Sequence, residues 1–204
     1  MIYIIDYKMG NLRSVRKALA RIGVDSIISN DLDLLKKAEK VILPGVGHFK
    51  KGMENLTQLG IKEVLDEHVL VGKKPLLGIC LGMQLLCTHS EEGDCHGLNY
   101  VAAWVKKFPK SILTTGQKIP HIGWNTITMQ GENEILNGID LTSHFYFVHS
   151  YYAEADGLLP NITTTTYGIE FISSLVKDNV YGTQFHPEKS YESGLSILRN
   201  FANI

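Results

Sequence analysis

Short apolar runs rich in branched residues alternate with helix-period segments through the first half of the chain. The runs lie at 1–6, 24–29, 40–44 and 74–79. The segments around them have helical periodicity, at about 11–23, 31–38, 48–59 and 61–71. Continuous apolar runs of this length are typical of parallel strands buried on both faces. The repeated β-α order therefore predicts a doubly wound α/β domain.

The first of these helices carries its own end signals. One face has apolar residues at helical spacing: Leu12, Val15, Leu19 and Ile22. Asn11 stands where an N-cap belongs, and Gly23 stands where a C-terminal cap belongs. The segment is therefore predicted to be an amphipathic helix packed on the sheet.

Six β-rich stretches separated by Gly, Asn and Pro fill most of the second half. They lie near 100–108, 121–129, 144–152, 162–167, 170–176 and 180–185. We expect them to extend the same sheet in mixed or antiparallel order. An apolar pattern at about 190–203 predicts a last helix against the sheet. With 204 residues, 44% of them hydrophobic, and no repeat or linker, we expect one domain over 1–204.

Charge and cysteine content exclude several classes of protein. The net charge is -1 and there are no runs of like charge, so the sequence predicts no basic surface that would bind nucleic acid or an anionic membrane. The apolar first residues lack a basic leader, and no apolar stretch approaches ~18 residues, so we expect no signal peptide and no membrane partner. Cys80, Cys87 and Cys95 are odd in number and lack C-x-x-C spacing, which favours a reducing, cytoplasmic compartment.

The strongest local signal surrounds Cys80, where a buried strand runs directly into a helix. Gly78 and Gly82 flank the cysteine at two residues on either side. Glycines at these positions permit a tight strained turn, so the pattern predicts a nucleophile elbow that exposes the thiol at the end of the strand. The following helix would favour the thiolate, and the Leu81 N–H would face a developing oxyanion. The alternative is that Cys80 is a small buried apolar residue.

A proton acceptor for such a thiol occurs late in the chain. His186 follows a predicted strand, and Glu188 stands two residues further on. We expect Pro187 to keep the chain extended, so that the carboxylate reaches back to the imidazole and fixes its tautomer. Taken alone, His-Pro-Glu could equally belong to a solvated loop.

The two signals together resemble the class I, triad-type glutamine amidotransferases. They are G-I-C-L-G-M-Q at 78–84 and G-T-Q-F-H-P-E at 182–188. A third segment, P-G-V-G-H-F at 44–49, is similar to the oxyanion strand of that family, although a strand-to-helix turn would also need these glycines. The resemblance implies glutamine hydrolysis by a triad without metal or cofactor. The triad would be Cys80, His186 and Glu188, with Leu81 and Val46 or Gly47 as oxyanion donors.

Three further segments narrow the resemblance to the glutamine amidotransferase subunits of imidazole glycerol phosphate synthases. They lie in register at 6–15, 118–125 and 146–152, and the resemblance covers essentially the whole chain. It implies a flavodoxin-like three-layer α/β/α sandwich with a mixed, largely parallel central sheet. It also implies a heterodimer with a (β/α)8 cyclase, a lyase partner that receives the ammonia in histidine biosynthesis.

The same resemblance assigns binding residues. Gln84 and Glu92 would hold the amino-acid end of glutamine, although Glu92 could also be a surface acid. Six residues would line the partner interface: Asn11, Arg13, Trp124, Asn125, Tyr146 and Lys189. Trp124 could instead belong to the core, and Lys189 could be a solvated cation.

The chain departs from the family at Lys8, Asn99 and Ala103, where glycine is usual. Because Lys8 lies beside the inferred interface, a second hypothesis stays open, in which a paralogous glutaminase subunit feeds a sugar-modifying amidotransferase. A cysteine peptidase or chaperone would share only the elbow. His121 and His149 are expected to be structural. We also expect low activity without a partner, because the turn at 44–47 could change conformation.

Overall fold

The strands of the first half pair in a parallel sheet, as their apolar runs predict. In the computed structural model, which describes residues 1–140 and 142–204, β1 (Ile2–Ile5) lies between β2 (Ser26–Ser29) and β3 (Lys40–Gly45). β4 (Leu76–Cys80) follows β3, and β14 (Val180–Thr183) pairs with the other side of β4. This order, β2-β1-β3-β4-β14, is the doubly wound order of flavodoxin-like folds.

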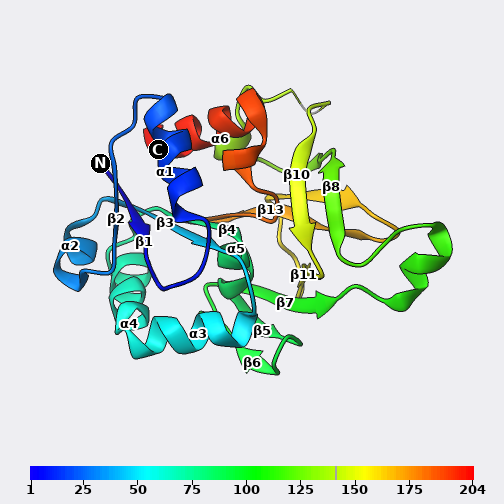
Figure 1. Ribbon diagram of the computed structural model, residues 1–204, viewed down its shortest axis with the longest axis horizontal. Coiled ribbons are helices and arrows are strands. Elements are labelled where there is room, and N and C mark those ends of the chain that lie inside the picture. The colour runs from blue at the N-terminus through cyan, green and yellow to red at the C-terminus, as the bar shows by residue number, and fades with distance from the viewer. Residues whose placement is uncertain (141) are drawn as a thin grey trace.

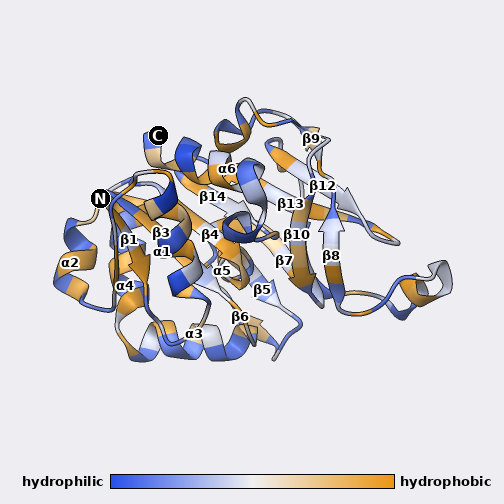
Figure 2. Ribbon diagram, turned by 45° about the horizontal axis from the view of Figure 1, so that its top comes forward, coloured by the Kyte–Doolittle hydropathy of each residue, from blue (hydrophilic) through white to orange (hydrophobic). Residues whose placement is uncertain are grey.

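Helices cover both faces of this parallel half (Figure 1). α1 (Leu12–Arg21) and α6 (Tyr191–Asn203) lie on one face, where Val15 and Leu198 pack with Ile4. α3 (Phe49–Gln58) and α4 (Ile61–Asp66) lie on the other, where Leu56 packs with Ile5. The short α2 (Leu32–Lys37) contacts α4. Figure 2 shows the hydrophobic strands between these layers, so the predicted three-layer sandwich is confirmed.

Two details of the loops follow the sequence signals. The Asn11 side chain accepts a hydrogen bond from the Ser14 N–H, and Gly23 has φ +76° directly beyond the end of α1. Lys8 and Asn99, two positions where the resemblance implies glycine, have φ 65° and 59°. Glycine adopts this left-handed region without steric cost, so the backbone at both positions suits a glycine. Ala103 is instead buried in a strand.

Antiparallel strands extend the sheet beyond β14. β13 (Glu170–Lys177) pairs with β14, and β11 (Tyr151–Ala155) and β7 (Val101–Lys107) follow in antiparallel order. β12 (Ile162–Thr166) joins β13 to the short β9 (Thr128–Gln130). Two strands that we did not predict, β5 (Cys87–Ser90) and β6 (Cys95–His96), complete the edge, with β5 parallel to β7. The sheet is therefore mixed, as expected.

One part of the second half differs from expectation. β8 (His121–Asn125) and β10 (Phe145–His149) do not extend the main sheet but pair with each other in a separate two-stranded sheet. Alternate residues of β10, Phe145 and Phe147, are fully buried and contact Phe185. This aromatic packing places β10 over the sheet rather than at its edge.

The helical segments also contain irregular turns. A π turn (Glu67–Val71) follows α4 where one continuous helix was expected. Short 3-10 helices lie at Lys110–Thr115, Glu134–Leu136 and Pro187–Lys189. None of the helices in the described ranges is long and apolar enough to cross a membrane.

Candidate active site

Cys80 sits at a sharp junction between β4 and α5 (Leu81–Leu85). Its φ of 54° and ψ of -109° belong to a region that side chains avoid, at a cost of order 1–3 kcal/mol. The neighbouring glycines have no room for a side chain. A Cβ on Gly82 would lie 1.7 Å from the Leu43 carbonyl oxygen, and one on Gly78 would lie 2.7 Å from the Gly82 backbone. The elbow is thus held by backbone contacts on both sides.

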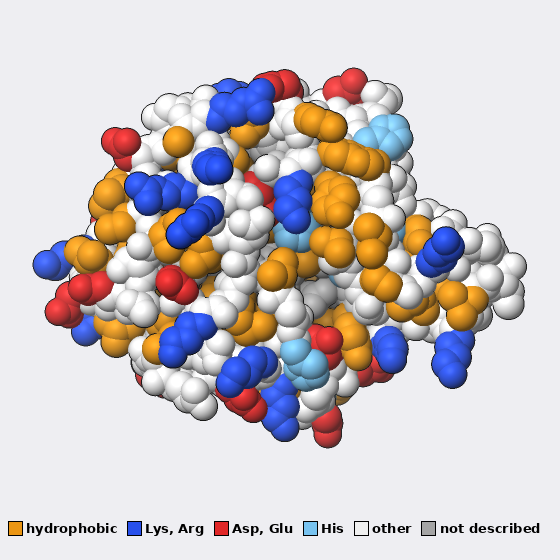
Figure 3. Space-filling view, in the orientation of Figure 1, with side chains coloured by type: hydrophobic (Ala, Val, Ile, Leu, Met, Phe, Trp, Pro, Cys, Tyr) orange, Lys and Arg blue, Asp and Glu red, His pale blue; other side chains and the backbone are white. Residues whose placement is uncertain are grey.

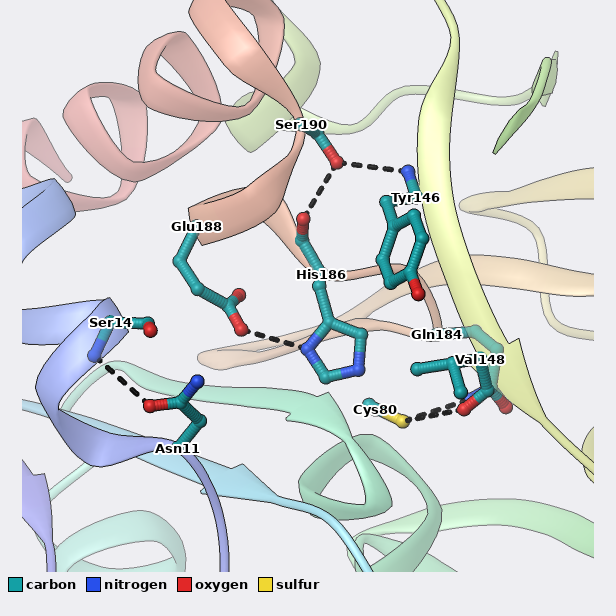
Figure 4. A network of polar contacts seen from close by, with 9 residues as sticks. All are labelled: Asn11, Ser14, Cys80, Tyr146, Val148, Gln184, His186, Glu188 and Ser190. Atoms are coloured by element: carbon teal, nitrogen blue, oxygen red, sulfur yellow. Dashed lines mark hydrogen bonds and ion pairs between the residues drawn. The ribbon is translucent and has the colours of Figure 1, made fainter. Parts of the chain in front are cut away.

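Parallel pairing brings two further segments to the same edge of the sheet. Gly45 at the end of β3 pairs with Cys80, and Thr183 at the end of β14 pairs with Ile79. The turn that carries Val46 and Gly47 therefore lies beside the thiol. The segment that leads to His186 flanks the thiol as well, as Figure 4 shows. This is the edge at which open α/β sheets bind their ligands.

His186 and Glu188 form a buried pair beside the cysteine. The imidazole Nδ1 lies 2.8 Å from Glu188 Oε1, and both side chains are only 2% exposed. Because the carboxylate accepts, Nδ1 carries the hydrogen, and Nε2 has no hydrogen-bond partner among the described residues. The ring lies next to Cys80 (Figure 4). The chain at Pro187 is not extended as expected but forms a 3-10 turn, which folds Glu188 back to the ring.

The charged groups next to His186 determine its protonation state. Burial alone would lower the pKa of His186, but the Cys80 sulfur and the Glu188 carboxylate outweigh burial and raise the pKa to about 10. The imidazole is therefore in its charged form at neutral pH when Cys80 is a thiolate. Such a pair is the activated state of a cysteine nucleophile.

Three residues that the sequence reading missed complete the surroundings. Cys80 Sγ lies 3.8 Å from the Val148 carbonyl oxygen and 3.7 Å from the Gln184 side-chain nitrogen. The Ser190 hydroxyl donates to the His186 carbonyl at 2.6 Å and accepts from the Tyr146 N–H at 3.1 Å, tying the catalytic turn to β10. Gln184 could have been found from sequence, because parallel pairing of its strand with β4 places it level with the elbow.

A cavity of about 280 Å³ opens in front of the thiol. Every residue that the sequence assigned to substrate or oxyanion lines it: Val46, Gly47, Leu81, Gln84 and Glu92. Pro120 and residues 148–151 also line the cavity. Glu92 is half-buried, and its carboxylate accepts a hydrogen bond from the Phe49 N–H at 2.7 Å, so it is not a free surface acid.

His121 and His149 are buried in an aromatic cluster with Phe108 and Phe147. His121 Nδ1 lies 3.1 Å from His149 Nε2, and His149 Nδ1 lies 2.7 Å from the Tyr151 carbonyl oxygen. Burial lowers the pKa of His121 to about 4 and that of His149 to about 3, so both rings are neutral. Across 1–140 and 142–204, no group of three ligating side chains could hold a metal ion.

Several of the predicted interface residues gather in one exposed cluster. Lys189 Nζ lies 5.3 Å above the Tyr146 ring, and Trp124, 42% exposed, has its ring 5.7 Å from that of Tyr146. Tyr191, which was not predicted, stacks on Trp124 at 4.9 Å. Figure 3 shows hydrophobic side chains over β8 and β10 on this face, with basic side chains over α1 beside them.

The remaining predicted interface residues lie around this cluster. Asn11 caps α1 through the Ser14 N–H (Figure 4). Arg13 is exposed on the first turn of the same helix. Asn125 follows Trp124 on β8, but its amide donates to the Thr166 carbonyl oxygen within the chain.

Comparison with known proteins gives concordant results. Residues 3–204 match the family described as glutamine amidotransferase class-I. The imidazole glycerol phosphate synthase subunit HisH 2 of Methanococcus maripaludis is 48% identical over 201 residues, covering 98% of each chain. The subunit HisH 1 of Campylobacter jejuni is 47% identical over 205 residues and covers all of both chains.

Solved structures resemble the fold at lower identity. A crystal structure of a glutamine amidotransferase aligns over 100% of both chains with a TM-score of 0.76 and 18% identity. A chain in the structure of PurLQS from Thermotoga maritima aligns with a TM-score of 0.71 and 18% identity, over 99% of this chain and 97% of its own.

Proposed function

The chain belongs to the class-I glutamine amidotransferase family, and we propose that it hydrolyses glutamine to glutamate and ammonia. One observation carries this proposal: a buried cysteine in a strained backbone conformation lies beside a histidine at the edge of the sheet. Nδ1 of that histidine is held by a carboxylate, and its Nε2 has no hydrogen-bond partner among the described residues. We assign Cys80 as nucleophile, His186 as general acid and base, and Glu188 as the residue that orients the imidazole.

The chemistry needs only side chains and backbone groups of this chain. The Cys80 thiolate attacks the carboxamide carbon, and the oxyanion that forms accepts hydrogen bonds from the N–H groups of Leu81 and of Val46 or Gly47. One such donor typically lowers the barrier by about 3–4 kcal/mol. His186 Nε2–H protonates the leaving nitrogen, ammonia departs, and a γ-glutamyl thioester remains. Water then gives its proton to Nε2, attacks the thioester and releases glutamate.

The cavity supports a free amino acid as substrate. Its volume of about 280 Å³ lies just below the usual range for pockets that hold drug-sized ligands, which suits a small substrate. Glu92 places a carboxylate where it can pair with the α-ammonium group of glutamine, and Gln84 supplies an amide on the same wall. This geometry disfavours the cysteine peptidase or chaperone alternative. A glutamine-analogue electrophile should therefore label Cys80, and labelling confined to Cys87 or Cys95 would contradict the assignment.

The acceptor of the ammonia follows from the relatives. Because full-length relatives that are 47–48% identical carry the name imidazole glycerol phosphate synthase subunit, we assign this chain to the same role in histidine biosynthesis. Its partner would be a (β/α)8 cyclase, bound as a heterodimer. The exposed cluster of Trp124, Tyr146 and Lys189 beside the catalytic turn supports this docking position, with Asn11, Arg13 and Asn125 around it.

The proposal also covers the cellular compartment and the domain organisation of the enzyme. Within the described residues all three cysteines are free thiols, which suits the reducing cytoplasm. We treat residues 1–204 as one glutaminase domain.

A single experiment separates the two halves of the function. Cys80→Ala protein, mixed with the imidazole glycerol phosphate cyclase, should support turnover with ammonium salts but not with glutamine. Wild-type protein should support both. Glutamine hydrolysis by Cys80→Ala at the native rate would contradict the triad. Wild-type glutaminase activity without any coupling to this cyclase would favour the sugar-modifying partner instead.

A further inference from the structure

The Gln184 side chain is the one amide in direct contact with the nucleophile among the described residues. It is fully buried, and its nitrogen lies 3.7 Å from Cys80 Sγ. The Gln184 backbone N–H donates to the Ser173 carbonyl at 2.8 Å, which holds the residue in place beyond β14. Because the amide is buried and its backbone is fixed, its oxygen and nitrogen have few possible hydrogen-bond partners. These partners determine which of the two atoms faces the sulfur.

Hydrogen-bond polarity fixes that orientation. The Tyr151 carbonyl can only accept, so the nitrogen of Gln84 faces it, at 2.9 Å. The same nitrogen lies 2.9 Å from the Gln184 side chain, which must therefore present its oxygen to Gln84. The Gln184 nitrogen is then turned toward Cys80. Gln84 thus donates to both the Tyr151 carbonyl and the Gln184 oxygen, and reversing either amide would oppose two donors or two acceptors.

We propose that Gln184 binds the Cys80 thiolate, donating a side-chain N–H to the sulfur and favouring the ionised nucleophile over the thiol. This inference deepens the proposed function and rests on it. The Val148 carbonyl, 3.8 Å from the sulfur, acts in the opposite sense because it can accept only from the S–H group. Hydrogen bonds to a charged acceptor are stronger than those to a neutral one, so the amide contact gains strength when the thiol loses its proton.

The test measures the reactivity of Cys80 without partner or glutamine. Iodoacetamide alkylation is followed by mass spectrometry between pH 5 and 10, since only the thiolate reacts. Gln184→Met keeps the length of the side chain and removes the donor. We expect the pH midpoint of Cys80 alkylation to rise by about one unit, with reaction about tenfold slower below the midpoint. Cys95, half-exposed and outside the lining of the cavity, serves as an internal reference whose profile should not change.

Two further variants distinguish loss of the hydrogen bond to the sulfur from a general disturbance of the packing. Gln184→Glu keeps the size and the oxygen facing Gln84 but places a carboxylate oxygen at the sulfur, so the midpoint should rise further than in Gln184→Met. Thr183→Val alters the preceding buried residue, whose hydroxyl has no partner in the described part of the chain, and should leave the midpoint unchanged. Unmoved midpoints in folded Gln184→Met and Gln184→Glu proteins would overturn the inference.

A measurement on the unchanged residue decides the matter if these variants do not fold. The Gln184 side-chain amide resonances of wild-type protein should shift with pH at the alkylation midpoint, and Cys80→Ala should abolish this transition. Resonances that ignore the ionisation of Cys80 would refute the contact. Absence of glutamine hydrolysis by the wild type in the presence of the cyclase would instead defeat the proposed function, whatever these titrations show.

Discussion

At the residue scale, the nucleophile occupies a backbone conformation that suits glycine better than cysteine. Cys80 has φ 54° and ψ -109°, and it is held there by β4 on one side and α5 on the other. The strain is local, because the flanking strands pair in regular register up to Cys80 itself. Cys80 is only 5% exposed, so the predicted exposure of the thiol is limited to the wall of the cavity. The surrounding sheet sustains the cost of holding it there.

This strain predicts an inverted order of stability. Alanine normally stabilises a folded protein relative to glycine by reducing the entropy of the unfolded chain. At position 80 we expect Cys80→Gly to be more stable than Cys80→Ala by about 1 kcal/mol, because glycine relieves the unfavourable φ and ψ. Urea denaturation of the two variants measures the difference. An alanine variant more stable than the glycine variant would show that the elbow is not strained.

At the element scale, the approach of α5 to β3 determines where the thiol sits. Gly82 on α5 faces the Leu43 carbonyl of β3 so closely that backbone atoms meet without any side chain between them. Leu81 and Leu85 pack beneath α3 on the same side. The position of the elbow is thus set by two elements in backbone contact.

We expect Gly82→Ala to destabilise the protein by about 3 kcal/mol or more, because the added Cβ would overlap the Leu43 carbonyl and force α5 away from the sheet. Gly116→Ala is the matched control. Gly116 has φ +83° but nothing within 4 Å of an added Cβ, so only backbone strain of about 1–2 kcal/mol applies. Thermal and urea unfolding compare the two. Equal losses would mean that α5 can shift freely.

The sequence predicted elements best where local signals act. Hydrophobic periodicity identified the parallel strands, and the cap residues Asn11 and Gly23 located α1. The two-residue β6 carries no such signal, since Cys95 and His96 are held by pairing with β5. The sequence predicts an extended chain at Pro187, but a 3-10 turn there brings Glu188 back to His186. Tertiary contacts, absent from any local window, decided these cases.

At the scale of the whole molecule, the second sheet was the main feature that the sequence did not predict. The alternating pattern of β10 is that of a strand with one buried face, and it fits either an extension of the main sheet or a separate layer. Packing of Phe145 and Phe147 against Phe185 selects the second arrangement. The same arrangement brings Val148 and His149 to the cavity, so the missed wall of the site has the same origin.

Global stability should depend on pH through the buried histidines of this layer. His121 and His149 have folded-state pKa values of about 4 and 3, below the ordinary value of 6.5, because burial disfavours their charged forms. The unfolded chain therefore binds more protons below pH 6.5, and stability falls as the pH decreases toward the folded values. Each histidine should cost about 2 kcal/mol of unfolding free energy between pH 7 and pH 5.

Urea denaturation at pH 7 and pH 5 checks this expectation. His121→Phe, which keeps an aromatic ring between Phe147 and Tyr167, should reduce the difference between the two pH values by about 2 kcal/mol. Replacement of the exposed His144 by Asn provides the control. A difference that is the same in wild type and His121→Phe would contradict the neutral, buried state of His121.

The contact between Gly82 and the Leu43 carbonyl also limits how such a chain can diverge over generations. Because backbone atoms fill the space, no smaller neighbouring side chain can make room for a substitution at position 82. Any side chain at position 82 would require the whole elbow to move. The exposed side chains of Trp124, Tyr191 and Lys189 meet no such barrier. Substitutions can therefore accumulate at this surface while the location of the thiol stays fixed.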